Sequence, residues 1–359
     1  MAPESPRQLR RRSQPVAFDP SAAALPGSGV FGLPHGEPEA AVILLPVPFE
    51  ATTSYGGGAS RGPAAILEAS RQVDLYDVET GRPYEAGIHM LPSPEPVVAL
   101  DAAARPEAAR VIAAGGVQED DPALVRAAAR VDEASRRVDA WVEEEVRRLL
   151  RKGKRVGVVG GDHAVAFGSI VAHAAAFPGM GLLHVDAHAD LRRRFEGFAR
   201  SHASILRNVM DGVEGVSRLI QVGVRDVSDE EVAYVEASGG RVVTHHDPVL
   251  AAARFAGETW AAQVQRIVEP LPRDVYVTFD IDGLDPTLCP HTGTPVPGGL
   301  SFQQACALLA GLARSGRRIV GFDLVEVAPG PEGSDWDGNV GARVLYKLVG
   351  WLLRSWRGA

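Results

Sequence analysis

The chain has 359 residues, of which 45% are hydrophobic and 23% are charged. These values lie near the globular average and permit a sizeable buried core. The formal net charge of −8 at pH 7 argues against nucleic acid as the main partner and suits a small cation. Cys289 and Cys306 are too few for a disulfide framework, and no stretch reaches the ~18 apolar residues of a membrane span. We therefore predict a cytoplasmic protein with no nucleic-acid or membrane partner.

The first part of the chain, residues 1–38, is rich in proline, alanine and glycine and has no periodic pattern. Its arginines at positions 7 and 10–12 resemble the start of a targeting segment, which is the alternative interpretation. Prolines and polar residues interrupt the sequence that follows, so no continuous apolar segment is present. We predict a flexible or loosely docked N-terminal arm over 1–38 and a single folded domain over 39–359.

Short apolar runs recur from residue 41 onward, each with the length of a strand that is buried on both faces. They occupy 41–45, 155–159, 181–185, 218–222, 241–244, 275–280 and 318–323. Amphipathic stretches lie between them, and this alternation predicts an α/β fold with a mostly parallel, doubly wound sheet. The clearest helix spans about 122–152, with Asp121 as its N-cap and Pro122 as its first residue. The preceding segment, 92–120, is rich in proline, alanine and glycine and is expected to be a loop or a partly ordered insertion.

Ionisable residues follow four of these predicted strands. They are Asp162 and His163, then Asp186, His188 and Asp190, then Asp280 and Asp282, and finally Glu326. Each small motif alone is more typical of a capped loop than of a ligand set. In an open α/β sheet, however, ligands bind beyond the carboxyl ends of the strands, where these groups would gather. Such a crowd of carboxylates would repel and desolvate its members unless positive charge were present, and divalent cations are the simplest source.

The charges of six candidate ligands are consistent with two such cations. The six are His163, Asp186, His188, Asp190, Asp280 and Asp282. Their four carboxylates balance two divalent ions, and a bridging hydroxide leaves the cluster near −1. Imidazole and carboxylate ligands without thiolate favour manganese over a soft metal. The sequence therefore predicts a binuclear site that suits a cationic substrate.

Four sequence blocks resemble the signature blocks of the ureohydrolase family, which comprises arginases, agmatinases, formimidoylglutamases and their relatives. The blocks are GGDHAV at 160–165, VDAHAD at 185–190, FDIDGLDP at 279–286 and LVEVAP at 324–329. Their order and approximate spacing also match. The stretch from 46 to 70, PVPFEATTSYGGGASRGPAAILEAS, is similar to the N-terminal block of agmatinases. The resemblance covers about 40–350, nearly the whole chain apart from the arm.

The resemblance implies a three-layer α/β/α fold and two Mn²⁺ ions per subunit. It also implies hydrolysis of a guanidino compound to urea and an amine. By carry-over, one metal takes His163, Asp186, Asp190 and Asp280, and the other takes His188, Asp186, Asp280 and Asp282. Asp186 and Asp280 would bridge the two ions. Family members usually form trimers or hexamers, so we expect a homo-oligomer.

The resemblance also implies roles in catalysis. Glu326 matches the carboxylate that pairs with the guanidinium, and Asp190 is expected to accept a hydrogen bond from the nucleophile. His202 falls where relatives place a proton-shuttling histidine, although an ordinary loop histidine is the alternative. Asp162 and Asp285 are expected to orient ligands or loops. The remaining histidines of interest are expected to be structural, with His291 a candidate to line the pocket: His173, His184, His245, His246 and His291.

The substrate is less well defined by the sequence. The block at 46–70 and the SHAS segment favour agmatine or a longer aminopropyl derivative over L-arginine. Arg192 is a candidate partner for the carboxylate of a guanidino or formimino acid; alternatively it is solvated or pairs with Glu196 or a neighbouring subunit. Glu196 is in turn a candidate to attract the far amine of a polyamine. A guanidinobutyrase, arginase or formimidoylglutamase activity therefore stays open. So do a catalytically silent binding protein on the same fold and a deacetylase with a single zinc.

Overall fold

A single eight-stranded sheet forms the centre of the computed structural model, which describes residues 18–331 and 334–357. The strand order is β2-β1-β3-β8-β7-β4-β5-β6, and neighbouring strands are parallel throughout. The strands are β1 (Val42–Val47), β2 (Ile88–Met90), β3 (Arg155–Gly160), β4 (Met180–Val185), β5 (Val216–Val222), β6 (Val242–His245), β7 (Asp274–Asp280) and β8 (Arg318–Val325). All seven predicted strands are confirmed. The edge strand β2 was missed because three residues show no recognisable period.

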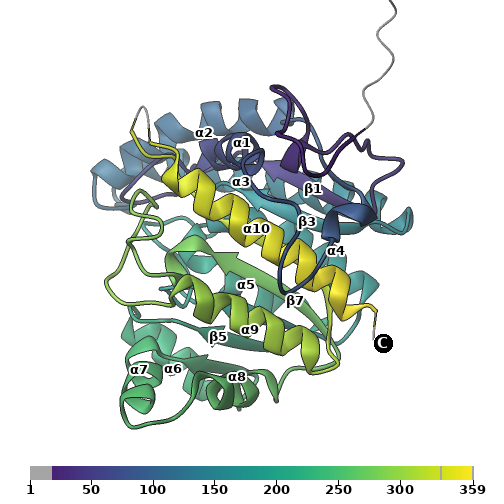
Figure 1. The fold of residues 1–359 in the computed structure, drawn as a ribbon. Coiled ribbons are helices and arrows are strands. Elements are labelled where there is room, and N and C mark those ends of the chain that lie inside the picture. Colours follow the sequence, from purple (N-terminus) through teal and green to yellow (C-terminus); the bar gives the residue numbers. More distant parts are fainter. Residues whose placement is uncertain (1–17, 332–333, 358–359) are drawn as a thin grey trace, which may run out of the picture.

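Helices cover both faces of the sheet and complete three layers. They are α1 (Gly62–Ser70), α2 (Glu95–Ala113), α3 (Pro122–Arg151), α4 (Ala166–Ala176), α5 (Ile205–Gly212), α6 (Asp229–Ala237), α7 (Asp247–Phe255), α8 (Trp260–Val268), α9 (Phe302–Arg314) and α10 (Trp336–Ser355). Figure 1 shows α9 and α10 side by side across one face. Alternate residues of a strand point to opposite faces. Accordingly, Val42 and Leu44 of β1 pack in the core that contains α9 and α10, whereas Ile43 and Leu45 pack against α2 and α3.

The segment 92–120, predicted as a loop or a partly ordered insertion, is largely helical. Helix α2 spans Glu95–Ala113 and buries Val97, Ala104, Ala108 and Val111 on one face. Proline at the start of the helix misled the prediction, although a first-turn proline lacks only an N–H that would have no helical partner. The many alanines of α2 favour the helix, because alanine has the highest helix propensity. The prediction for 122–152 is confirmed by α3, whose N-cap Asp121 accepts hydrogen bonds from the backbone N–H groups of Ala123 and Leu124.

The expected N-terminal arm contains a packed section. Residues 1–17 lie outside the described part, so the prediction for them stays open there. Farther along, Val30, Phe31 and Leu33 are buried, and the ring of Phe31 lies 4.7 Å from that of Tyr346 in α10. The division of the chain at residue 38 therefore remains a prediction. None of the helices in the described segments combines the length and apolar character that crossing a bilayer requires.

The order of the central strands explains where the site lies. Strands β3, β8, β7 and β4 are neighbours in the sheet, although they are far apart in the sequence. All four are parallel, so their carboxyl ends meet at one edge, where ligands of open α/β sheets bind. Each of the four ends in one of the four sequence blocks that contain the candidate site residues.

Candidate metal centre

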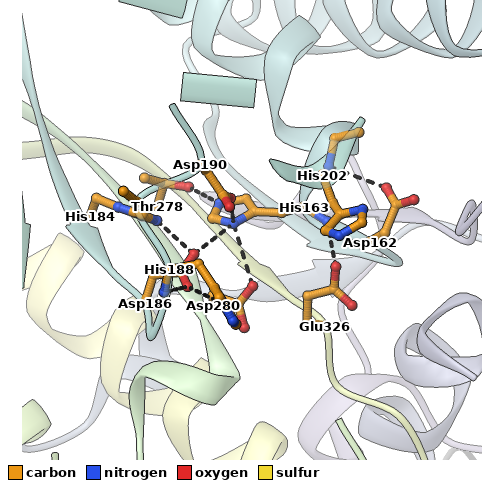
Figure 2. A network of polar contacts seen from close by, with 12 residues as sticks. Asp162, His163, His184, Asp186, His188, Asp190, His202, Thr278, Asp280 and Glu326 are labelled. Carbon is orange, nitrogen blue, oxygen red and sulfur yellow. Dashed lines mark hydrogen bonds and ion pairs between the residues drawn. The ribbon is translucent and has the colours of Figure 1, made fainter. Parts of the chain in front are cut away.

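The first group of side chains surrounds the Nδ1 atom of His163 (Figure 2). This atom lies 3.1 Å from Asp186 Oδ2, 3.0 Å from Asp190 Oδ2 and 3.4 Å from Asp280 Oδ2. All four side chains are almost completely buried. They come from the ends of β3, β4 and β7, so the sheet itself brings them together.

A second group adjoins the first. The Nδ1 atom of His188 lies 3.3 Å from Asp186 Oδ1 and 3.2 Å from Asp282 Oδ2. Asp186 therefore offers one carboxylate oxygen to each group. The structure brings together the six predicted ligands as two adjoining sets that share this aspartate.

Backbone hydrogen bonds hold the carboxylates in place. The N–H of His188 donates to Asp186 Oδ1 at 2.6 Å, and the N–H of Ala187 donates to Asp282 Oδ1 at 3.0 Å. The N–H of Asp282 donates in turn to Asp280 Oδ1 at 2.9 Å. The two loops approach closely because of Gly283, where a Cβ atom would lie 2.7 Å from the backbone nitrogen of Asp186. These bonds leave other lone pairs of the same oxygens available for a cation.

One residue of the cluster and one residue beside it have left-handed backbone conformations. Asp190 has φ 56° and Glu326 has φ 62°. Such a conformation costs a non-glycine residue about 1–3 kcal/mol and persists where the surroundings enforce it, most often at functional sites. At Glu326, the backbone N–H donates to the carbonyl oxygen of Gly161 at 2.8 Å. The strain is consistent with side chains that must be aimed in a particular direction.

The orientation of His163 depends on two residues that the sequence did not indicate. Its Nε2 atom lies 2.7 Å from Thr278 Oγ1, and the Thr278 hydroxyl donates to Asp323 Oδ1 at 2.8 Å. Because the hydroxyl proton is used on Asp323, Thr278 accepts the proton of His163 Nε2. The Nδ1 atom is then the one that faces the carboxylates. A histidine whose outer N–H is hydrogen bonded in this way is typical of metal ligands.

The pKa shifts indicate that this edge of the sheet lacks positive charge. Burial, together with neighbouring carboxylates, raises the pKa of Asp280 and of Glu326 well above the usual range. Burial lowers the pKa of His188, but Asp282 and Asp186 outweigh it and raise that pKa to about 12. Divalent cations would supply the positive charge that the carboxylates lack and would leave the imidazoles as neutral ligands. The donor set therefore fits divalent metal ions.

Glu326 lies beside the cluster, and one of its carboxylate oxygens has no hydrogen-bond partner. Its Oε1 atom accepts the backbone N–H of His163 at 3.0 Å, whereas Oε2 is buried with no hydrogen-bond partner. A cavity of about 370 Å³ opens nearby, lined by Tyr55, Gly56, Gly57, Arg61, Pro290, His291, Thr292, Gly293, Pro295, Pro329, Gly330 and Pro331. A Cβ atom at Gly293, which lines this cavity, would lie 3.6 Å from Glu326 Oε2, although Glu326 itself is not a lining residue. The unpartnered oxygen is suited to a cationic group of a ligand.

His202 is held by Thr52, which sequence reasoning missed. The backbone N–H of His202 donates to Thr52 Oγ1 at 3.1 Å, and Nδ1 lies 3.4 Å from the same atom. The Thr52 hydroxyl donates to Asp162 Oδ2 at 2.9 Å, so Asp162 contacts the threonine that holds His202, and its orienting role stays a prediction. Asp285 caps an exposed turn by accepting the backbone N–H of Thr287, so its contact is with a loop. Burial lowers the pKa of His202 to about 4, and the charges of His188 and His163 add to this effect.

The two predicted substrate-binding residues of the 191–197 segment make other contacts. The guanidinium of Arg192 lies over the ring of Phe195 and 3.8 Å from Glu231. Phe195 itself meets the ring of His202 edge-on, so one aromatic ring separates Arg192 from the candidate shuttle. The Oε2 atom of Glu196 is buried without a partner, and its backbone oxygen accepts the N–H of Val117. A role for Arg192 and Glu196 in substrate binding stays a prediction.

Comparison with known proteins gives the family. The model of the arginase family matches residues 40–350. The chain belongs to the arginase family. An N(1)-aminopropylagmatine ureohydrolase of Thermus thermophilus is 35% identical over 325 residues, which cover 88% of this chain and 94% of that protein. An agmatinase of Bacillus anthracis is 30% identical over 88% of this chain and 93% of its own length.

Solved structures of the arginase family confirm the fold. The agmatine ureohydrolase of Thermoplasma volcanium superimposes with a TM-score of 0.69 at 24% identity and covers 90% of this chain and 93% of its own. The predicted three-layer architecture, the family and the class of enzyme, a hydrolase of C–N bonds, are thereby confirmed. In this arginase-family member, the two adjoining ligand sets are the candidate catalytic centre.

Proposed function

We propose that the protein binds two divalent cations, manganese by preference, and hydrolyses the guanidinium of agmatine or an agmatine derivative to urea and a primary amine. The observation that carries this proposal is the sharing of Asp186 between the sets centred on His163 and His188. One set would comprise His163, Asp186, Asp190 and Asp280, and the other His188, Asp186, Asp280 and Asp282. The names of the relatives from Thermus thermophilus and Bacillus anthracis support the choice of substrate.

The reaction needs a nucleophile that water at neutral pH does not provide. When bound, a pair of divalent cations would lower the pKa of water from about 15.7 towards 7. The carboxylate of Asp190 would accept a hydrogen bond from the attacking oxygen and so direct its lone pair. A guanidinium is a poor electrophile, and this alignment is therefore a large part of what the protein contributes.

Glu326 would hold the substrate. Its buried Oε2 has no hydrogen-bond partner, and a guanidinium presents N–H groups that match a carboxylate. The positive charge of the guanidinium would also stabilise the ionised form of Glu326, whose pKa burial raises. The contact would place the guanidinium carbon over the attacking oxygen while the rest of the substrate extends into the cavity.

His202 would move the proton that the leaving group needs. Because burial keeps its pKa at about 4, the imidazole is neutral near pH 7 and is not a standing acid. It would take a proton released on attack and pass it to the leaving amine. The C–N bond then breaks, and urea and the protonated amine result. Thr52 would keep the imidazole in position for both transfers.

The lining of the cavity favours a second candidate substrate. Among the described residues that line it, Arg61 and His291 carry cationic or basic groups, and none is aspartate or glutamate. His291 is anchored by the buried Asp337, 2.8 Å from its Nδ1 atom. Such a rim suits a carboxylate at the far end of a guanidino acid better than a second ammonium. A guanidino acid is therefore the alternative to agmatine.

A panel assay tests the proposal. The manganese-loaded enzyme and a chelator-treated control are given agmatine, aminopropylagmatine, arginine, guanidinobutyrate and formimidoylglutamate. Metal-dependent urea from agmatine or its aminopropyl derivative is the expected result. Urea from guanidinobutyrate alone would favour the second candidate. Urea from none of the guanidino compounds, with formamide from formimidoylglutamate, would overturn the proposal.

We also propose a cytoplasmic location and a trimeric or hexameric assembly. Both come from the family resemblance and from the residue composition. Light scattering on the purified full chain would measure the mass of the assembly, and a mass near 38 kDa, that of one chain, would contradict the oligomer.

A further inference from the structure

His184 is a fully buried histidine that the mechanism above does not use. It lies on β4 two residues before Asp186, so both side chains point to the same face of the strand. Its Nε2 atom lies 2.8 Å from Asp186 Oδ2. The ligand atoms of His163, His184, Asp186 and Asp190 all lie within 4.8 Å of one another. By distance alone, His184 qualifies either as a further ligand or as a group that positions Asp186.

The neighbouring strands decide which nitrogen of His184 carries its proton. Gln221 of β5 is the register partner of His184, and Thr244 of β6 is the register partner of Gln221. The amide nitrogen of Gln221 lies 2.7 Å from the carbonyl oxygen of Ala189 and 3.0 Å from His184 Nδ1. The amide oxygen of Gln221 accepts the hydroxyl of Thr244 at 2.8 Å.

This arrangement leaves one assignment of donors and acceptors. A backbone carbonyl oxygen only accepts, so the Gln221 atom beside Ala189 must be the nitrogen. Its second N–H then points to His184 Nδ1, which must accept. The ring proton therefore resides on Nε2 and is donated to Asp186 Oδ2. A nitrogen that carries a proton cannot also bind a metal ion.

We propose that Gln221 and His184 form a relay that positions Asp186 for both metal ions, and that His184 is not itself a ligand. The relay rests on the proposed function, since it deepens the account of the metal site. With His184 on Oδ2 and the N–H of His188 on Oδ1, both oxygens of the shared carboxylate are held. Gln221 also holds the carbonyl of Ala189, directly before the left-handed Asp190. The amide of Gln221 therefore contacts groups next to both ends of the 186–190 segment: His184 beside Asp186, and the carbonyl of Ala189 before Asp190.

Nitrogen NMR of the full chain with ¹⁵N-labelled histidine reads the proton position directly. Spectra are recorded before and after loading with Cd²⁺, a diamagnetic probe, and the His184→Gln variant assigns the resonance. The relay predicts a neutral ring with the proton on Nε2 in both states. A proton on Nδ1, a doubly protonated ring, or loss of the Nε2 proton on Cd²⁺ loading would overturn it. The position of the proton is read from the wild-type spectra, and the variant serves only to assign the resonance of His184.

Metal affinity, measured by chelator competition with Mn²⁺, tests the consequence. Gln221→Glu keeps the volume but turns the donor into an acceptor, which draws the proton to Nδ1 and leaves a lone pair against Asp186. We expect affinity to fall roughly 10–100-fold, as for other groups that orient ligands. Gln263→Glu is the matched control, because Gln263 is equally buried and donates to the carbonyl of Leu250 in α7, away from the site.

A pair of substitutions at His184 separates positioning from packing. His184→Gln retains an N–H donor towards Asp186, whereas His184→Met fills similar space without one. The glutamine variant is expected to bind Mn²⁺ within about threefold of wild type, and the methionine variant at least about tenfold more weakly. Equal affinities for wild type, His184→Met and Gln221→Glu would overturn the relay alone. A wild-type chain that binds no divalent cation would overturn the proposed function as well.

Discussion

The backbone N–H of His163 donates a hydrogen bond of 3.0 Å to Glu326 Oε1. The two residues follow β3 and β8, which are adjacent in the sheet and 163 positions apart in the chain. This bond joins the histidine that faces the metal cluster to the carboxylate proposed to hold the guanidinium. The position of the substrate relative to the metal ions is therefore set by the backbone of neighbouring strands.

Glu326→Gln should separate substrate binding from metal binding. The amide retains an oxygen that can accept the N–H of His163, so the fold and the metal content should be unchanged. The negative charge opposite the guanidinium is lost, and kcat/KM for urea release should fall by about 100-fold or more, or roughly 3 kcal/mol. Steady-state kinetics with metal analysis would measure both quantities. Wild-type kinetics in a fully loaded variant would remove Glu326 from the mechanism.

Asp186→Ala should abolish metal loading at both positions, because its two oxygens serve both ligand sets. Metal content after dialysis against Mn²⁺ would measure this. Asp101→Asn is a suitable control, since Asp101 is buried but accepts the backbone N–H of Glu50, a bond that asparagine can retain. An Asp186→Ala variant that kept two ions would contradict the shared carboxylate.

Thr278→Val should weaken metal binding without removing a ligand. Valine matches the shape of threonine but cannot accept the Nε2 proton of His163, which then lacks a partner in a buried site. Mn²⁺ affinity should fall by roughly 10–100-fold. Thr80→Val provides the comparison, because the Thr80 hydroxyl is buried and donates to Asp77, remote from the cluster. Equal losses in the two variants would indicate general destabilisation instead.

The stability of the fold should decline in mild acid partly through His173. This side chain is fully buried, and burial lowers its pKa to about 4 from 6.5. Below pH 6.5 the unfolded chain therefore binds a proton that the folded chain does not. The resulting loss begins below pH 6.5, is complete below pH 4, and amounts to about 3 kcal/mol.

His173→Leu should flatten this part of the pH profile. Denaturant unfolding of metal-free wild type and variant between pH 7 and 4 would measure the difference in slope. Identical pH dependence in the two proteins would mean that His173 is protonated in the folded state or makes no contribution.

The parts of the site at the ends of strands could be predicted from the sequence, whereas those in the middle of strands could not. Asp186 directly follows β4, His188 comes two residues later, and Asp280 is the last residue of β7. The parallel sheet brings such ends together. Thr278 and Asp323, in contrast, look like polar residues inside buried strands. Their role depends on the register that places them opposite each other on β7 and β8. A sequence without known pairing gives no such register.

The same limit applies to His184 and Gln221, whose pairing across β4 and β5 exists only in the folded sheet. The failure at 92–120 has another cause. By local preference, Pro106 within α2 argues against a helix, whereas the prolines at the start of α2 are compatible with one. The buried face formed by Val97, Ala104, Ala108 and Val111 stabilises the helix despite the missing N–H of Pro106. Tertiary packing therefore outweighed local preference.

If two divalent cations share the carboxylate of Asp186, anomalous diffraction at the manganese absorption edge should locate both in crystals of the manganese-loaded protein. We expect two peaks per chain about 3.5–4 Å apart, one beside His163 and one beside His188, with Asp186 between them. A single peak, or none between these side chains in a fully loaded crystal, would contradict this sharing of Asp186.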